Sequence, residues 1–313
     1  MAFAPRLRSK KPAGQVKIFF MRHKIVLAVS GGIVVGLVAL GLVVLNQTAV
    51  VPTATYKTHL PAPTPSTLSL PVSAPSAAQL AAAPEARYDA VIPGLIPYAS
   101  DSMATASHIT YQLAADTALF GVDQRTVVAR LPATNFLRQP TVVVPVKTSG
   151  DWVLILTPAR NALPSSQHNL AAAQTAGWVH QSALTHPTAL TQRVVISTTA
   201  RTLTIMNLDS TAPTSFPIGV GTATTPTPTG VTGYLQARYL DPAQGQLKYP
   251  IQLTSLHSAV GDNPYGGVDG GLVGIHFQTL STGAVSHGCI RVPVAAITAI
   301  NLLPLGTSIS IKN

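Results

Sequence analysis

The stretch GIHFQTLSTGAVSHGCIRVP, residues 274–293, contains the only cysteine in a chain of 313 residues. Cys289 is preceded by Ser-His-Gly and followed by Ile-Arg. A lone thiol can be an inert core residue, a metal ligand or a nucleophile. The residues around Cys289 therefore decide which fold and which chemistry we expect.

These surroundings offer what a nucleophilic cysteine needs, namely a nearby base, donors for an oxyanion and a lowered thiol pKa. His276 lies 13 residues upstream at the end of an apolar run and is the candidate base. The N–H groups of Gly288 and Cys289 can point together into an oxyanion pocket. Arg291 adds positive charge two residues away. A helix expected to begin just past Cys289 would favour the thiolate through its N-terminal dipole.

Alternating apolar and polar residues predict an all-β domain of the sandwich kind over residues 190–313, with a small helix after the cysteine. Residues 193–208 form two alternating runs around a polar turn, which predicts a hairpin. Residues 217–239 read as a strand, a Pro/Thr/Gly turn and another strand. The helix is predicted within residues 292–304 and a last strand within 307–313.

The preceding block, residues 87–186, also reads as a β module. Two β-branched runs, residues 141–147 and 152–156, flank a Ser-Gly-Asp turn and predict a hairpin. Residues 177–184 predict a further strand. Residues 108–121 suggest a short helix.

The N-terminus combines a basic tail, residues 1–24, with the uncharged apolar run 25–45. This run of 21 residues would span about 31 Å as a helix, which is the thickness of a bilayer core. Seven cations precede it, so we expect a single transmembrane helix with a cytoplasmic N-terminus and the remainder outside the cell membrane. The alternative is a cleaved signal peptide, whose apolar region should run only about 7–15 residues.

The net charge of +10 could indicate nucleic-acid binding, but the distribution of the charge argues against this function. Seven of the 20 basic residues precede residue 25, and all ten acidic residues follow residue 84. Residues 46–86 are rich in Pro, Ala, Thr and Ser and predict an extended linker. This linker is either a passive stalk or a tether that lets the exterior part reach a distant target.

The cysteine stretch resembles the motif of YkuD-type L,D-transpeptidases, in which a histidine is followed after a loop by Ser/Thr-His-Gly-Cys, an apolar residue and Asn or Arg. Residues 286–291 fill this pattern one for one. The turn TPTPTG, residues 225–230, resembles the family's turn into the active-site sheet, and GTSISI resembles its closing strand. Residues 87–186 resemble the small SH3-like barrel that often precedes this catalytic domain in actinobacterial cell-wall enzymes.

The resemblance implies a mainly all-β cysteine acyltransferase of the cell wall that acts on peptidoglycan stem peptides. Cys289 would attack a stem tetrapeptide, release its terminal D-alanine and pass the acyl group to an amine of a second stem, giving a 3→3 cross-link. His276 would act as base and then as acid, while Ser286 and His287 would orient the loop, with His287 a secondary candidate for the base. The resemblance implies no cofactor and no metal, and we expect a monomer.

Two departures from the family pattern concern the pocket. The interval from His276 to Cys289 is about three residues shorter than is usual, and Phe277 stands where a small residue is common. Both changes affect the orientation of His276 and the width of the pocket.

Four alternatives are distinguishable. An L,D-carboxypeptidase would pass the same thioester to water, and a non-catalytic peptidoglycan-binding protein would not need Cys289. A zinc site from His276, His287 and Cys289 matches no compact ligand spacing. A sortase carries its cysteine and its arginine on separate strands, unlike the Cys-Ile-Arg sequence here.

Overall fold

The computed structural model describes residues 74–99, 108–209, 211–261 and 271–313. These residues all fall within one compact unit. The predicted basic tail and membrane helix, and the linker up to residue 73, lie outside the described residues. In the part that the structure describes, no helix has the length and hydropathy needed to cross a membrane.

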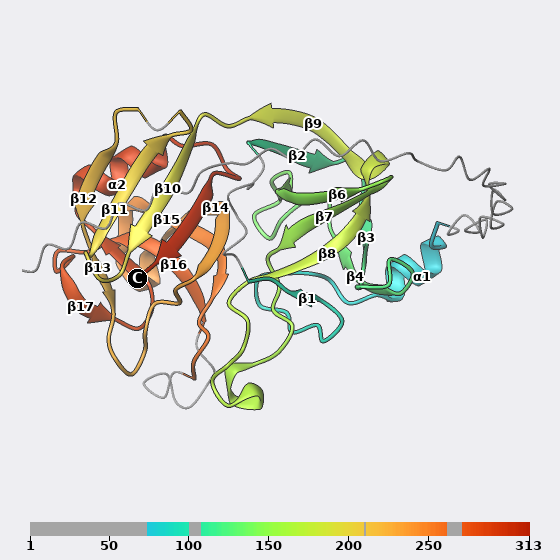
Figure 1. Ribbon diagram of the computed structural model, residues 1–313, viewed down its shortest axis with the longest axis horizontal. Coiled ribbons are helices and arrows are strands. Elements are labelled where there is room, and N and C mark those ends of the chain that lie inside the picture. The colour runs from blue at the N-terminus through green and yellow to red at the C-terminus, as the bar shows by residue number, and fades with distance from the viewer. Residues whose placement is uncertain (1–73, 100–107, 210, 262–270) are drawn as a thin grey trace, which may run out of the picture. The chain divides into compact units, whose positions relative to one another are not determined.

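The N-terminal part of this unit, named the module below, is built from two sheets, drawn from cyan to yellow-green in Figure 1. The larger sheet has the order β4-β3-β8-β7-β6, with β1 also paired to β8, and the smaller has the order β5-β2-β9. The strands are β1 (Ile96–Pro97), β2 (Ile109–Leu113), β3 (Thr117–Phe120), β4 (Val127–Leu131), β5 (Val142–Val143), β6 (Pro145–Ser149), β7 (Trp152–Thr157), β8 (Thr175–His180) and β9 (Leu184–Ala189). Short 3-10 turns follow β7 and β8, at η2 (Pro164–Gln167) and η3 (Gln181–Ala183). Apolar side chains from both sheets, including Leu113, Val143 and Ile155, share one core.

The hairpin predicted in the module is confirmed as β6–β7, which turns at Gly150 with a φ of +56°. The run 141–147 is divided, however, because β5 pairs with β2 and β6 begins only at Pro145. The helix predicted over residues 108–121 is wrong. That segment forms β2 and β3, because Ile109 to Leu113 gain ladder partners on β9 that no local pattern reveals.

Ordered structure begins inside the segment predicted as linker. Helix α1 (Ala77–Ala82) starts at a capping box, in which Ser76 Oγ accepts from the Gln79 N–H at 3.2 Å and Gln79 Oε1 accepts from the Ser76 N–H at 2.9 Å. Two reciprocal bonds satisfy N–H groups that a helix start otherwise leaves unpaired. The linker therefore ends before the predicted residue 86.

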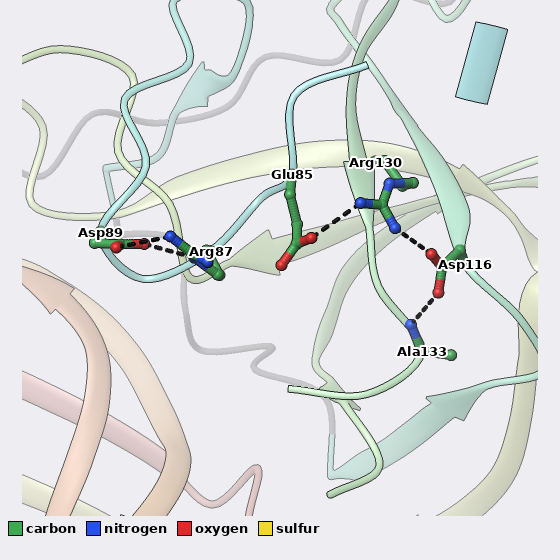
Figure 2. Close-up of polar contacts among 6 residues, drawn as sticks. All are labelled: Glu85, Arg87, Asp89, Asp116, Arg130 and Ala133. Carbon is green, nitrogen blue, oxygen red and sulfur yellow. Dashed lines mark hydrogen bonds and ion pairs between the residues drawn. The ribbon is translucent and has the colours of Figure 1, made fainter. Parts of the chain in front are cut away.

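An ion-pair network attaches the chain after α1 to the module (Figure 2). Arg130 on β4 donates to Glu85 at 2.9 Å and also pairs with Asp116. Asp116 in turn accepts from the Ala133 N–H at 2.9 Å, and this hydrogen bond together with Arg130 lowers the pKa of the Asp116 carboxyl. These contacts join three segments that are distant in the sequence.

The C-terminal part is one continuous ladder of ten strands in the order β12-β11-β10-β19-β14-β15-β16-β18-β13-β17, coloured yellow to red in Figure 1. The strands are β10 (Gln192–Ser197), β11 (Thr202–Asn207), β12 (Thr214–Pro217), β13 (Gly219–Gly221), β14 (Val231–Asp241), β15 (Gln246–His257), β16 (Leu272–Phe277), β17 (Gly283–Ser286), β18 (Ile290–Val292) and β19 (Ser308–Lys312). Strand β14 pairs with β19 through its first half and with β15 through its second half, with a bulge after Leu235. It thereby links the two layers of the sandwich.

One core fills the space between these layers. It contains Ile196 of β10, Ile275 of β16 and Ile290 of β18, all fully buried, together with the apolar side of helix α2 (Val294–Asn301). The predicted hairpin β10–β11, the helix after the cysteine and the last strand are all confirmed.

The module and the C-terminal part share buried polar contacts. Ser255 Oγ on β15 donates to Gln174 Oε1 at 2.6 Å and accepts from the Tyr234 N–H at 3.1 Å. His257 Nε2 lies 3.0 Å from the carbonyl oxygen of Tyr88. The predicted boundary at residue 186 is also crossed by a strand, since β9 continues to Ala189.

Candidate active site

Strand alternation places Cys289 on the face of the sheet opposite the core. Ile275 of β16 and Ile290 of β18 are paired and point into the core. Successive side chains on a strand point to opposite faces, so the neighbouring pair His276–Arg291 faces the other way. Cys289 lies in the bend directly before β18, and the same alternation, continued by one residue, would put its side chain on the side of this pair.

A row of five residues crosses this face of the sheet. Tyr239 of β14 pairs with Ile251 of β15, and the register of β15 with β16 carries the row on to His276. His276 pairs with Arg291, and Arg291 pairs with Gly219 of β13. The candidate base and the arginine are thus adjacent members of one row.

The next row provides space beside the thiol. Leu253 pairs with Gly274, and Gly274 and Cys289 each directly precede the paired residues Ile275 and Ile290. A Cβ added at Gly274 would have one atom within 4 Å, on Ile251 at 3.4 Å. His276 lies diagonally across from Cys289, and diagonal neighbours on adjacent strands are roughly 7–8 Å apart. An imidazole and a thiol can meet over such a separation by side-chain rotation, as apo catalytic pairs often must.

Cys289 itself is half-buried and reduced. Its Sγ lies 3.7 Å from the carbonyl oxygen of Leu272, a weak thiol hydrogen bond. Its own carbonyl oxygen accepts from Ser286 Oγ at 2.6 Å. The thiol thus faces the start of β16, and the hydrogen bond from Ser286 fixes the backbone carbonyl of Cys289.

Ser286 closes the tight turn that contains the cysteine. It is buried, and besides donating to the Cys289 carbonyl its Oγ accepts from the Gly288 N–H at 3.2 Å. Gly288 has a φ of +108°, which side chains rarely adopt. Since the Gly288 N–H points at Ser286, the predicted oxyanion role of Gly288 does not fit this geometry. The Cys289 N–H stays the predicted donor.

The turn TPTPTG, residues 225–230, donates two hydrogen bonds to carbonyl groups of the cysteine turn. Thr225 Oγ1 donates to the Ser286 carbonyl at 3.2 Å, and Thr227 Oγ1 donates to the Gly288 carbonyl at 2.9 Å. Thr227 Oγ1 also accepts from the Gly221 N–H at 2.9 Å. A Cβ at Gly221 would lie 2.2 Å from the Thr225 carbonyl oxygen, so only glycine fits there.

The surroundings of His276 favour its neutral form. Its pKa is lowered, first by burial and further by the charge of Arg291, although the contact with the Phe277 carbonyl opposes this. Nδ1 lies 3.2 Å from that carbonyl oxygen. The contact favours the tautomer with its proton on Nδ1, which leaves Nε2 as the proton acceptor at neutral pH.

The other sequence-predicted residues take different positions. His287 is exposed next to Gly288. Arg291 is partly buried beside His276. The helix dipole does not act on the thiol as predicted, because β18 intervenes and α2 begins only at Val294. A dipole effect falls off within about one turn of the helix end.

Sequence reasoning missed an aromatic pair at the end of the row. The ring of Tyr239 packs edge-on against Phe136 of the module, with ring centroids 5.9 Å apart, and Phe136 packs against Tyr88 at 4.6 Å. Burial is the main cause of the raised pKa of Tyr239, and the charges of Asp241, Tyr88 and Cys289 add to it. The alternating pattern of β14 could have marked Tyr239, whereas nothing in the sequence pointed to Phe136.

Within the described ranges, no group of three or more His, Cys, Asp or Glu side chains is arranged to hold a metal ion.

Comparison with known proteins finds a similarity in the C-terminal part. Residues 191–311 match the family model for the L,D-transpeptidase catalytic domain, YkuD. No curated protein sequence matches the chain.

Three solved structures illustrate the similarity. An L,D-transpeptidase from Stackebrandtia nassauensis is 14% identical over 39% of this chain and 55% of its own, with a TM-score of 0.29. An L,D-transpeptidase from Mycobacterium smegmatis is 15% identical over 52% of this chain and 91% of its own, with a TM-score of 0.29. L,D-transpeptidase 1 of Mycobacterium tuberculosis is 15% identical over 44% of this chain and 78% of its own, with the same TM-score of 0.29. At these scores the structures add no argument, and the similarity to the family rests on the match of residues 191–311.

Proposed function

We propose that this chain cross-links peptidoglycan through a thioester on Cys289, because residues 191–311 match the family model for the L,D-transpeptidase catalytic domain, YkuD. The observation that carries the proposal is the shared face of Cys289, His276 and Gly274, where a thiol and a neutral imidazole adjoin space left by a glycine. The substrates are a tetrapeptide donor stem and an acceptor stem with a side-chain amine, and the products are a 3→3 linked pair of stems and free D-alanine.

In the first half-reaction His276 Nε2 takes the thiol proton of Cys289. The thiolate attacks the carbonyl carbon of the L,D bond, and the oxyanion is stabilised by the Cys289 N–H. The protonated His276 then donates its proton to the nitrogen of the terminal D-alanine. The C–N bond breaks, D-alanine leaves, and a thioester remains on Cys289.

In the second half-reaction the side-chain amine of a neighbouring stem attacks the thioester. His276 takes a proton from this amine as the new C–N bond forms, and Cys289 leaves as thiolate and is reprotonated. Water in place of the amine gives the L,D-carboxypeptidase outcome. Ser286 holds the nucleophile turn in both steps through its two hydrogen bonds.

The location of this chemistry is part of the proposal. The apolar run 25–45 and its preceding cations support a single-pass anchor in the cell membrane, with the catalytic domain outside and facing the cell wall. The Pro-rich segment after it supports a tether that lets a monomeric enzyme reach the wall.

A carbapenem tests the nucleophile, since its strained lactam presents a carbonyl to the thiolate. Incubating the full chain in detergent with a carbapenem should add one drug mass, on the peptide that contains Cys289. Cys289→Ser should lose the adduct, because a hydroxyl is far less acidic than a thiol. His276→Ala should abolish adduct formation in a folded protein, while His287→Ala should reduce it only in part.

A tetrapeptide stem with and without an amine acceptor separates the possible functions. A cross-linked dimer identifies a transpeptidase, and tripeptide alone identifies a carboxypeptidase. A folded sample that gives neither adduct nor product would instead favour a non-catalytic peptidoglycan-binding protein.

A further inference from the structure

Two hollows adjoin at β2 of the module, and Tyr111 lines both of them. The first has a volume of about 410 Å³ and lies between Tyr111 and β6, with Lys147 and Gln181 on its wall. The second has a volume of about 440 Å³, with Gln112 and Gln139 on its wall. Each volume falls within the roughly 300–1,000 Å³ typical of ligand pockets. Since they share a wall, the two hollows form one extended groove, named the Tyr111 groove below.

A bulge in β9 shapes the second hollow. The register of β9 against β2 shifts beside Tyr111, so that this one residue lies opposite both His186 and Pro187. His186 has a φ of +49°, a left-handed conformation that is uncommon for residues with a Cβ, and it lines the hollow. Bulges re-aim side chains and are over-represented beside functional sites. The irregular backbone of β9 therefore presents His186 to the groove.

The C-terminal part forms the far wall of the second hollow. Pro304 and Leu305, which follow α2, line it together with Thr110 of β2. Gly306 packs closely against the same strand, since an added Cβ would collide with the Thr110 side chain. The groove is thus pre-formed by the junction of the module with the C-terminal part, as most ligand pockets are pre-formed by their folds.

The wall of the Tyr111 groove suits a neutral ligand that is rich in hydroxyl and amide groups. Gln112, Gln139 and Gln181 each offer both amide donors and an amide acceptor. The Tyr111 ring has an apolar face, against which the C–H face of a sugar ring can pack, and a hydroxyl that can form a hydrogen bond. Among the described residues that line the groove, Lys147 alone carries a permanent charge. The lining therefore favours a saccharide over an anion.

We propose that the Tyr111 groove binds the glycan strand of peptidoglycan, a chain of N-acetylated sugar rings, at a site apart from the active site. This inference rests on the proposed function, from which the identity of the polymer is taken. The residues that line the groove include none from the cysteine turn, β16 or β18. Holding the strand at a second site raises the effective concentration of stems around Cys289.

Binding of a β-1,4-linked tetramer of N-acetylglucosamine to the full chain tests the proposal. The probe carries the sugar rings without a stem, and a detergent without a sugar headgroup avoids competition. Isothermal titration calorimetry should show saturable binding. Because the recognition is uncharged, Kd should stay within about twofold between about 0.1 M and about 1 M NaCl, over which the Debye length falls from about 10 Å to about 3 Å. A free tetrapeptide stem should not displace the tetramer.

Variants of the lining residues locate the site. Gln139→Ala should weaken binding roughly 2- to 10-fold, the loss typical of one neutral hydrogen bond. Tyr111→Leu should weaken it at least as much, since the side chain stays apolar but loses its ring. Gln167→Ala, at an exposed glutamine of the module outside the groove, and Cys289→Ser should both keep the wild-type Kd. Gln139 is exposed, so its replacement should leave the unfolding midpoint unchanged and tests the proposal even if Tyr111→Leu unfolds.

Three results would overturn the proposal. The first is a wild-type chain that does not bind the tetramer, and the second is binding that Gln139→Ala and a folded Tyr111→Leu leave unchanged. The third is binding that is lost at high salt and in Lys147→Met, or displaced by the tetrapeptide, which would assign the groove to an acidic peptide.

Adduct formation with a carbapenem measures the proposed function separately. A wild-type chain that forms the adduct but does not bind the tetramer overturns this inference alone. A chain that binds the tetramer but forms no adduct overturns the proposed function and supports the glycan site.

Discussion

His276 and Arg291 lie directly opposite each other on the parallel strands β16 and β18. A permanent cation beside an imidazole disfavours its protonated form, which adds to the effect of burial on the pKa of His276. The strand pairing therefore keeps the candidate base neutral at the pH where it has to accept a proton.

Replacing Arg291 by Met should move the acidic limb of the pH–rate profile to higher pH. The rate falls as pH drops through the pKa of His276, because the protonated ring is no longer a base. Removing the cation raises that pKa, so the fall begins at a higher pH. The pH dependence of kcat/KM for release of D-alanine from a tetrapeptide stem measures this shift. Arg201→Met, on the exposed turn before β11, is the control and should leave the acidic limb of the profile unchanged. An acidic limb that stays in place or moves to lower pH in Arg291→Met would contradict the prediction.

Replacing Thr227 by Val should loosen the turn that contains Cys289. Valine keeps the shape but removes the hydroxyl that joins the Gly221 N–H to the Gly288 carbonyl. Thr227 is 5% exposed, so both groups lose a buried partner, at a cost of about 1–3 kcal/mol in the free energy of unfolding. The free energy of unfolding, measured in urea, and the rate of carbapenem adduct formation should both be lower than in the wild-type chain. Thr229→Val, on the exposed part of the same turn, should lower neither the free energy of unfolding nor the rate of adduct formation. Equal values for the two variants would show that the Thr227 hydroxyl does not stabilise the cysteine turn.

His257 should make the protein less stable in acid. Its pKa is lowered to about 3, first by burial and then by the charge of Arg160. The unfolded chain takes up a proton below about pH 6.5 and the folded chain does not, so the free energy of unfolding should decrease from pH 6.5 toward pH 3. The slope approaches about 1.4 kcal/mol per pH unit.

Urea unfolding of His257→Gln across this pH range tests the assignment. Glutamine keeps an N–H that can donate to the Tyr88 carbonyl but does not titrate, so its slope should be smaller than that of the wild-type chain. His108→Gln, at an exposed position, should keep the wild-type slope. If both variants retain that slope, His257 is not the source of the acid sensitivity.

The C-terminal fold was predictable because its signals are local. Alternation identified the hairpin β10–β11, and the apolar helix and last strand followed from short patterns. The helix predicted over residues 108–121 failed because β2 and β3 are stabilised by pairing with β9 and β8, which lie far along the chain. Tertiary pairing overrides a weak local propensity.

The site was predictable in its residue types but less so in its geometry. The motif predicted Cys289, His276 and Ser286 as site residues, and the structure places Ser286 in the cysteine turn and His276 on the neighbouring strand β16. The dipole effect expected from α2 does not fit the structure, because the short strand β18 lies between the cysteine and that helix. The Gly288 N–H donates to Ser286, and Gly288 has a positive φ. The order of residue types does not show this direction of the N–H group. The contact between the module and β14 could not be predicted either, because Phe136 reaches Tyr239 from a loop that is distant in the sequence.

This last contact gives a prediction about the module. Phe136→Ala should raise KM for the stem donor severalfold with little change in kcat, because Tyr239 loses the ring that fixes it at the end of the His276 row. Loss of an aromatic pair costs about 0.5–1.5 kcal/mol, so the variant should remain folded. Steady-state kinetics together with urea unfolding separate the two effects. Leu137→Ala, the adjacent half-buried residue of the same loop, should leave KM unchanged. Equal KM values for Phe136→Ala and the wild-type chain would show that the module does not shape the donor site, and equal increases in both variants would assign the effect to the loop rather than to the ring.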